Sequence, residues 1–407
     1  MMRLVMPDRA LEGLTIIEVG TRGAASYGAK MLADLGADVI KVEPPTGDPD
    51  RALGPFPGGE ANPEKSGTYL YLNTNKLGVT LDISGEKGRA VLGKLAAKAD
   101  ALIHDYPPAE AEAAGLTYDA IRAANPDIIM TSVTPFGQTG PHKDFKANDL
   151  TLQGAGGWLW INGWPGEPEL APLKAFGRQP AYQGGVNGAL ATMGALYGRS
   201  RGGPGQHIDI SIQECIAAIL EYVLPMWSYM ETPVVRWGQR PIQPIDMFKC
   251  KDGAWVFVLC IEEHQWERLV ELMETPEWAT WEVAANRFVR ASNWDALQPF
   301  MEEWVSQWNA DDLYRAAQDK RIPFAPVSTL GDLLDSDHLK ARGFFVEVAH
   351  PEAGTLTHAG APFKLSETPW EIRSPAPTLG QHNAEVFGET LGLSGAEIEA
   401  LEAEGVS

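Results

Sequence analysis

Short apolar runs alternate with amphipathic segments in the N-terminal part of the chain. Residues 14–20 (LTIIEVG) and 37–42 (ADVIKV) are β-branched runs typical of buried strands, and residues 26–35 between them have helical spacing. The same order recurs in a helix at 88–97, a strand at 99–103, a helix at 118–124 and a strand at 127–133. Alternating strands and helices predict a parallel sheet covered by helices. We therefore expect an α/β fold with an open, Rossmann-like parallel sheet.

The pattern changes in the middle of the chain. An apolar helix at 186–197 is expected after the break at Gly184-Gly185, and residues 208–220 lead into another. Residues 231–244 are proline-rich and predict a linker. A β-hairpin is then expected at 248–260, with Asp252-Gly253 at its turn, followed by helices at 264–273 and 296–308.

These changes predict three segments. Residues 1–225 are expected to form the first part of a large α/β domain, 226–339 a smaller inserted α+β domain with its linkers, and 340–407 a return to the large domain. A chain of 407 residues with 44% hydrophobic and 21% charged residues is long enough for both.

Composition excludes several classes of function. The net charge of −21 opposes nucleic acid and anionic membranes as partners, since both attract basic proteins. No apolar run approaches the roughly 20 residues that span a bilayer. The start, MMRLVMPDRALEG, lacks a secretory h-region, so we expect a cytoplasmic protein. Cys215, Cys250 and Cys260 have no C-x-x-C spacing, so neither a disulfide framework nor a metal site is expected.

A dinucleotide site is a weaker alternative. Gly20-Thr21-Arg22-Gly23 follows a predicted strand, and Glu43 ends the next strand, as in a Rossmann nucleotide site. The middle glycine of G-x-G-x-x-G is missing, so the backbone has no reason to approach a pyrophosphate.

Five collinear segments resemble family III CoA-transferases, the group of formyl-CoA transferase and carnitine CoA-transferase. They are LGADVIKVEPP (35–45), GDPDR (47–51), NTNK (73–76), FGQTGP (136–141) and GPGQH (203–207). The resemblance implies a CoA thioester as substrate, no permanently bound cofactor, and an interlocked dimer.

The resemblance also implies an aspartate nucleophile, which this chain lacks. Counting back from Gly203-Pro204-Gly205-Gln206 places that aspartate at Ala181, and no carboxylate occurs between Glu169 and Asp209. A covalent nucleophile must be present for acyl transfer through an enzyme intermediate. The position that the resemblance assigns to the nucleophile therefore has no reactive side chain. Asp149 is the fallback candidate for a catalytic acid or base.

Other departures fall at positions that resemble the family's active site. Gly23 stands where the family has an amide side chain, and Ala113 where it has an arginine for a CoA phosphate. The adenine loop reads His104-Asp105-Tyr106, which adds an acidic residue.

Four residues remain as candidate CoA contacts. The resemblance assigns Lys76 and Lys146 to CoA and lets Tyr106 stack on adenine, and Arg51 is a further candidate. Each also has a structural reading: Lys76 and Lys146 as solvated lysines, and Arg51 as the partner of a neighbouring carboxylate. Asp149 could equally be a turn residue or a helix N-cap.

The sequence leaves three functions open. The first is a non-catalytic subunit of a heteromeric CoA-transferase that moves CoA between succinyl-CoA and a carboxylic acid, with a homologous subunit carrying the aspartate. It resembles the aspartate-less subunit of succinyl-CoA:benzylsuccinate CoA-transferase, and the dense Trp158, Trp160 and Trp164 would suit an aromatic acid.

The second is an independent CoA-ester lyase, isomerase or hydratase that uses Asp149, and the third is an ordinary homodimeric CoA-transferase. Racemisation is disfavoured, because it needs a base on each face of the α-carbon and the two positions that resemble the racemase bases are Asn148 and Ala181.

Overall fold

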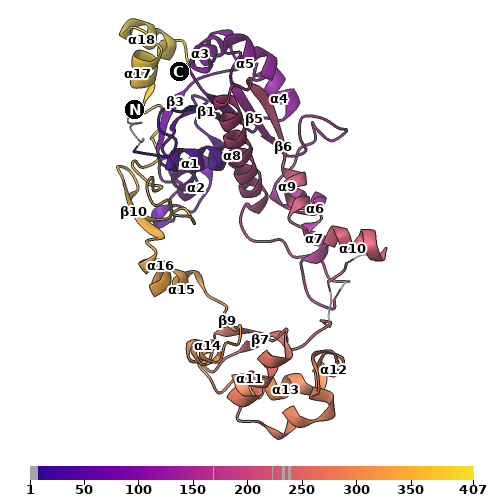
Figure 1. Ribbon diagram of the computed structural model, residues 1–407. Helices are drawn as coiled ribbons and strands as arrows, with labels where there is room; N and C mark the ends of the chain where they lie inside the picture. The colour runs from indigo at the N-terminus through magenta and orange to yellow at the C-terminus, as the bar shows by residue number, and fades with distance from the viewer. Residues whose placement is uncertain (1–7, 168, 222, 232–233, 237–239) are drawn as a thin grey trace, which may run out of the picture. The chain divides into compact units, whose positions relative to one another are not determined.

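The computed structural model describes residues 8–167, 169–221, 223–231, 234–236 and 240–407. The chain divides into two units (Figure 1). Unit 1 comprises Met1–Asn162, Leu173–Val234 and Gly343–Ser407, and unit 2 comprises Gly163–Pro172 and Val235–Arg342.

Six parallel strands form the sheet of unit 1 in the order β3-β2-β1-β4-β5-β6. The strands are β1 (Thr15–Val19), β2 (Asp38–Glu43), β3 (Lys76–Thr80), β4 (Ala101–His104), β5 (Ile129–Thr134) and β6 (Gln206–Ser211). The strand order reverses between β1 and β4, as in doubly wound folds. This confirms the predicted α/β fold with a Rossmann-like parallel sheet.

Helices cover both faces of this sheet (Figure 1). Successive strand residues point to opposite faces. Ile16 therefore packs in one core with helices α1 (Ala24–Asp34), α8 (Gln179–Ser200) and α9 (Ile212–Ala218). Its neighbour Ile17 packs in the other core with α3 (Glu86–Ala96), α5 (Tyr118–Ala124) and α18 (Gly395–Ala403). Burial on both faces explains why the strands are apolar runs rather than alternating ones.

The remaining elements of unit 1 are short. They include α2 (Gly67–Leu72), α4 (Pro108–Ala113), α6 (Asp149–Ala155), α7 (Trp158–Ile161), α10 (Val223–Met230), α17 (Asn383–Glu385), a 3₁₀ turn (Pro49–Ala52), and the antiparallel hairpin of β10 (Phe345–His350) and β11 (Gly354–Ala359).

Unit 2 contains an antiparallel sheet and helices around a separate core. Its strands are β7 (Ile245–Lys249), β8 (Trp255–Leu259) and β9 (Ala325–Pro326), and its helices are α11 (Glu263–Leu272), α12 (Arg287–Ser292), α13 (Trp294–Val305), α14 (Ala310–Asp319), α15 (Leu330–Asp335) and α16 (Asp337–Ala341). The core includes Val256, Trp266, Trp294 and Leu297. The pairing of β7 with β8 confirms the predicted hairpin. Part of the predicted linker, 232–233 and 237–239, lies outside the described residues.

Two element predictions were wrong. Helix α8 begins at Gln179 and runs through Gly184-Gly185 instead of starting after them. Gly185 allows α1 and α8 to approach, since a Cβ there would lie 2.8 Å from the carbonyl oxygen of Ala24, and Gly184 packs against Ile212 and Val133. Residues 206–211 form strand β6, and helix α9 begins only at Ile212. Strand β3 was missed because a lysine and a glycine interrupt its short apolar pattern.

Candidate functional site

A cavity of about 310 Å³ lies at the carboxyl ends of β1 and β4, where the strand order of the sheet reverses. Thr21, Arg22 and Ala24 follow β1, and Asp105 follows β4; all four line the cavity. Open α/β sheets bind ligands at this point, because the connections on either side leave a crevice between them. The topology therefore marks this cavity as the candidate site.

Ala181 lies in the first turn of α8 and lines the cavity. Its helix is fixed by the close packing on α1, where a Cβ at Gly28 would lie 2.9 Å from the carbonyl oxygen of Gly185. The methyl group of Ala181 supplies no nucleophile, base or charge. The residue predicted at the nucleophile position thus lies in the candidate site, without a reactive group.

The guanidinium of Arg178 lies beside Gly23. Arg178 is the residue before α8, and a Cβ at Gly23 would lie 2.7 Å from its Nη2 atom. Gly23 also has a φ of +83°, which disfavours other residues. Arg178 therefore occupies the space that a side chain at position 23 would need.

Arg178 forms an ion pair with Asp50 of the 3₁₀ turn. Its Nη1 atom donates to Asp50 Oδ1 at 2.8 Å, and Nη2 donates to the carbonyl oxygen of Arg22. Asp50 is 2% exposed, and its Oδ2 atom has no hydrogen-bond partner among the described residues. Burial and the nearby Asp48 raise the pKa of Asp50 to about 6, against the attraction of Arg178. Asp50 is therefore an acid that titrates near neutral pH.

Asp105 holds the loop between β1 and α1. Its Oδ1 atom accepts from the Thr21 N–H at 2.9 Å, and its Oδ2 atom accepts from the Arg22 N–H at 3.0 Å. Burial raises the pKa of Asp105, while these N–H groups and the charge of Arg22 lower it. Its oxygen atoms are already occupied by the backbone, so Asp105 has a structural role.

Asp149 is the first residue of α6 and lines the cavity. Asn148 is the N-cap, and its Oδ1 atom accepts from the Thr151 N–H at 3.0 Å. The cap considered for Asp149 therefore belongs to Asn148. The Oδ2 atom of Asp149 lies 2.6 Å from Lys174 Nζ and accepts from Gln153 Nε2 at 2.9 Å. Its Oδ1 atom is buried without a partner among the described residues.

Lys76 belongs to a buried ionic network below the cavity. Its ammonium donates to Glu18 Oε2 at 2.6 Å, to the Ser26 carbonyl oxygen at 2.8 Å and to Asn73 Oδ1 at 2.8 Å. All three N–H donors of the ammonium are thus used. Burial lowers the pKa of Lys76 to about 8, against the attraction of Glu18. The side chain of Lys76 is fully enclosed.

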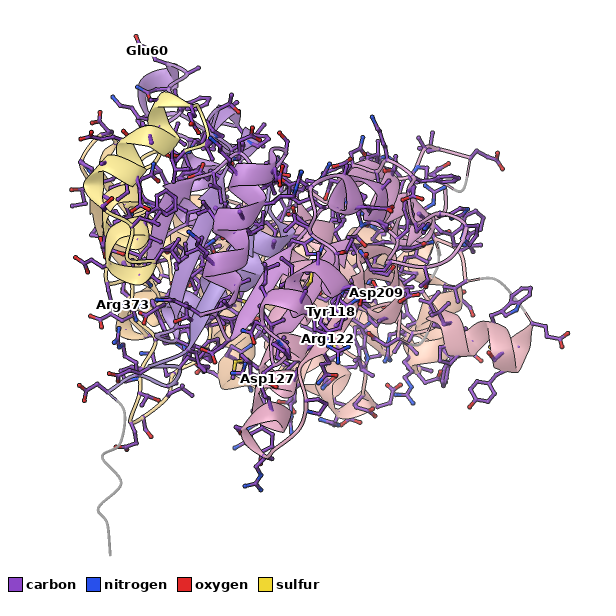
Figure 2. All side chains as sticks on the ribbon, turned by 90° about the horizontal axis from the view of Figure 1, so that it is seen from above. Glu60, Tyr118, Arg122, Asp127, Asp209 and Arg373 are labelled. Carbon is purple, nitrogen blue, oxygen red and sulfur yellow. The ribbon has the colours of Figure 1, made fainter. Side chains whose placement is uncertain are left out.

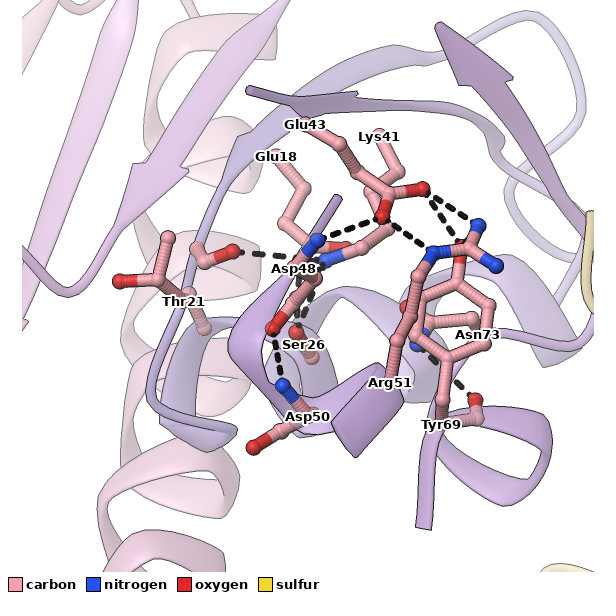
Figure 3. Close-up of polar contacts among 12 residues, drawn as sticks. Glu18, Thr21, Ser26, Lys41, Glu43, Asp48, Asp50, Arg51, Tyr69 and Asn73 are labelled. Atoms are coloured by element: carbon pink, nitrogen blue, oxygen red, sulfur yellow. Dashed lines mark hydrogen bonds and ion pairs between the residues drawn. The ribbon is translucent and has the colours of Figure 1, made fainter. Parts of the chain in front are cut away.

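Lys41 completes this network, between Glu18 and Asp48 (Figure 3). Its ammonium lies 2.8 Å from Glu18 Oε1 and 2.7 Å from Asp48 Oδ2. Burial alone would raise the pKa of Glu18, but Lys41 and Lys76 hold it at about 2. The two ammonium groups are paired with the carboxylates of Glu18 and Asp48, and buried charges need such opposite partners.

Arg51 is held by two carboxylates. Its Nε and Nη2 atoms donate to the two oxygens of Glu43 at 2.7 and 2.8 Å (Figure 3). Its Nη1 atom donates to Glu64 at 2.8 Å. Lys146 is exposed, and Tyr106 is half-buried with the Arg22 guanidinium 6.0 Å from its ring centre. None of Lys76, Arg51, Tyr106 and Lys146 lines the cavity. Their roles toward CoA stay predictions.

A second hollow of about 360 Å³ is lined by Tyr118 at the start of α5 and by His207, and the two rings stack. Ser132 Oγ lies 2.8 Å from His207 Nε2 and 2.6 Å from His104 Nε2. His104 Nδ1 accepts the Tyr106 N–H, so Nε2 carries the proton and donates to Ser132. Burial and the nearby His207 lower the pKa of His104 to about 3. His104 is therefore a neutral, satisfied residue.

The sequence contained signals for some of the residues that we missed. Glu18 and Lys41 are charged residues inside runs predicted to be buried strands, and such residues need an opposite charge nearby. Arg178 is one of the few charged residues in the stretch between Glu169 and Asp209. Asp50 gave no signal, because its burial depends on how the turn after β2 folds back.

The arrangement can bind and orient a ligand, but it offers little covalent chemistry. Ala181 is inert, Asp105 is occupied by backbone N–H groups, and Asp149 is paired with Lys174. Within the described ranges, no group of three or more His, Cys, Asp or Glu side chains could hold a metal ion. In the same part of the chain, no helix has the length and apolar character needed to cross a bilayer.

Comparison with known proteins gives a single result. The model of "CoA-transferase family III" matches residues 11–383. The chain is 32% identical to the succinyl-CoA–L-malate CoA-transferase alpha subunit of Chloroflexus aurantiacus, over 96% of this chain and 91% of the relative. It is also 32% identical to the succinyl-CoA:(R)-benzylsuccinate CoA-transferase subunit BbsE of Thauera aromatica, over 92% and 93%. A solved CAIB/BAIF family protein from Brucella suis is 30% identical, with a TM-score of 0.85 over 94% of this chain and 100% of that one.

Proposed function

The chain belongs to CoA-transferase family III, and we propose that it is a non-catalytic subunit of a heteromeric CoA-transferase. The enzyme moves CoA between succinyl-CoA and a carboxylic acid. A homologous subunit with an aspartate at the position of Ala181 performs the chemistry. The observation that carries this proposal is the methyl group of Ala181 on the wall of the cavity.

The chemistry of acyl transfer explains why one residue matters so much. A carboxylate nucleophile forms a covalent intermediate, and its loss removes far more rate than the loss of a binding contact. The other carboxylates around the cavity do not replace it. Asp105 is occupied by backbone N–H groups, and Asp50 is paired with Arg178. A partner subunit is therefore required for turnover.

Two features support a heteromeric assembly. The relatives from C. aurantiacus and T. aromatica are both subunits by their names. On α8 itself, the apolar side chains of Leu190 and Tyr197 are 70% and 64% exposed. Large exposed apolar side chains on one helix favour a protein partner that covers them.

The acid substrate of the assembly is proposed to have a hydrocarbon body, either aromatic or aliphatic. Nine of the fifteen residues that line the cavity are apolar, including Leu53, Val133, Leu152 and Ile212. Trp158 and Trp160, which suggested an aromatic acid, do not line this cavity. The apolar lining of the cavity, and not the tryptophans, therefore supports a substrate with a hydrocarbon body.

One observation favours a second candidate function. Asp149 lines the cavity with a buried, unpartnered Oδ1 atom, as an acid or base in contact with substrate would. An independent CoA-ester lyase, isomerase or hydratase could use it. The pairing of its other oxygen with Lys174 is the reason we place this function second.

Co-purification tests the proposed function. The tagged chain, isolated from its native extract, is expected to bring down an equimolar homologue that carries the aspartate. The recovered complex is expected to show succinyl-CoA-dependent thioester formation, and the chain expressed alone is not. A fully active preparation of this chain alone would contradict the proposal.

A further inference from the structure

We propose that the cavity beside Ala181 is a binding site for the free carboxylate of an organic acid, anchored by the guanidinium of Arg178. This inference rests on the proposed function, in which the subunit has lost its nucleophile. It adds that this subunit binds a ligand in the cavity although it has no nucleophile there. The ligand is an organic acid with a hydrocarbon body, bound without covalent chemistry.

Arg178 has donors left for a ligand. A guanidinium carries five N–H donors, and in the described part of the chain Arg178 gives one to Asp50 and one to the carbonyl oxygen of Arg22. Its side chain is 29% exposed and lines the cavity. Guanidinium groups match carboxylates in a bidentate geometry, which makes a carboxylate the ligand group that fits.

The other charges of the cavity wall have partners of their own. Arg22 pairs with Glu110 at 2.6 Å, and Asp149 pairs with Lys174 at 2.6 Å. Asp105 accepts two backbone N–H groups in the loop before α1, which disperse its negative charge. Asp50 accepts a single N–H from Arg178, and its second oxygen atom has no hydrogen-bond partner among the described residues. Arg178 is therefore the cation with capacity for an incoming anion.

The rest of the cavity suits the hydrocarbon body of such an acid. Leu53, Val133, Leu152 and Ile212 are among its apolar lining residues. A volume of about 310 Å³ is at the small end of small-molecule sites, which run from roughly 300 to 1,000 Å³. An acid of the size of benzoate fits this space, with its ring against the apolar wall and its carboxylate toward Arg178.

The guanidinium of Arg178 can lie at the cavity wall only because residue 23 is a glycine. Because a Cβ there would lie 2.7 Å from Nη2 and 2.9 Å from Cζ of Arg178, even alanine at position 23 would displace the guanidinium. The absence of a side chain at position 23 and the placement of Arg178 are thus one structural feature, which gives the cavity a guanidinium for a carboxylate.

Titration of the full chain with benzoate and with its neutral analogue benzamide tests the proposal. Benzoate is expected to bind more tightly than benzamide, and Arg178→Met is expected to weaken benzoate binding about tenfold or more while leaving benzamide binding unchanged. Arg22→Gln, in the same cavity but paired with Glu110, is the matched control and should retain the preference.

Gly23→Ala is the second variant, since it keeps the charge of Arg178 and moves it. It is expected to lose the preference for benzoate as Arg178→Met does. Thermal unfolding of each variant checks that it folds. Equal affinity for the two compounds, no saturable binding of benzoate, or unchanged benzoate binding in both Arg178→Met and Gly23→Ala would overturn the proposal. None of these results depends on catalysis, so they leave the proposed function to its own test.

Discussion

Arg178 and Asp50 form an ion pair of 2.8 Å that joins the start of α8 to the turn after β2. Asp50 is buried, and its second oxygen has no partner in the part of the chain that the structure describes. One contact with a partly exposed arginine does not offset the burial of a carboxylate. The charge of Asp50, and with it the ion pair to Arg178, therefore depends on the pH of the solution.

The first prediction concerns the pH dependence of stability. The pKa of Asp50 is about 6 in the folded chain against an ordinary 3.8, so between these values the native state binds the proton more tightly than the unfolded chain does. The free energy of unfolding should therefore fall as pH rises through this window, as far as Asp50 contributes. Asp50→Asn is expected to gain stability relative to the wild type between about pH 4 and pH 7.

Urea unfolding of both proteins across this range measures the difference. Glu60→Gln is the matched control, because Glu60 is exposed and projects from the surface of unit 1 (Figure 2). It should follow the wild type at every pH. A constant difference between Asp50→Asn and the wild type would contradict the assignment.

The second prediction is that Ala181→Asp alone does not create a working transferase. Residue 178 lies one turn before residue 181, so Arg178 should pair with the new carboxylate and reduce its nucleophilicity. The amide side chain at position 23 is also missing. CoA exchange between succinyl-CoA and several acids is expected to stay at the level of the control Ala181→Asn. Turnover comparable to that of an ordinary family member would refute this prediction.

The third prediction is that Lys76 stabilises the fold. Lys76→Met removes one of the two ammonium groups around the buried Glu18 and leaves Asn73 Oδ1 without its donor. Breaking a buried ion pair costs about 3–5 kcal/mol of the free energy of unfolding. Lys87→Met is the control, because its ion pair with Glu404 is exposed, and it should have little effect. Denaturant unfolding distinguishes the two, and equal stability would show that Lys76 is not needed for the network.

The fourth prediction is that the chain alone binds CoA weakly. Of the three cations considered for CoA, Lys76 is enclosed and Arg51 is held by Glu43 and Glu64, while Lys146 is exposed to solvent. The net charge of −21 also repels a polyanion. Calorimetric titration at physiological salt is expected to give a dissociation constant well above about 1 µM, and Lys146→Gln should weaken what binding remains. A submicromolar constant would indicate a working CoA site in this chain.

The sequence predicted the sheet well and the site only in part. Four of the six strands were found, because burial on both faces makes them continuous apolar runs, as in residues 14–20 and 37–42. The residue predicted at the nucleophile position, Ala181, lines the cavity, and that position stays a prediction.

Contacts between distant segments could not be predicted in this way. The approach of Arg178 to Gly23 and Asp50 depends on how α8 packs on α1, and the enclosure of Lys76 depends on Glu18, in another strand. Gly184-Gly185 misled the prediction for the same reason. In sequence these glycines indicate a break, but in the fold they allow close helix packing.

One measurement tests the central claim most directly. This chain is co-expressed with the homologue that carries the aspartate, and succinyl-CoA-dependent thioester formation on an organic acid is measured for three assemblies. These are the unmodified pair, the pair with Asp→Ala at the homologue's nucleophile position, and the pair with Asp149→Asn in this chain. We predict that the homologue's substitution abolishes turnover and that Asp149→Asn leaves it nearly unchanged. Loss of turnover on Asp149→Asn, or full activity of the homologue without this chain, would contradict the account of a non-catalytic subunit.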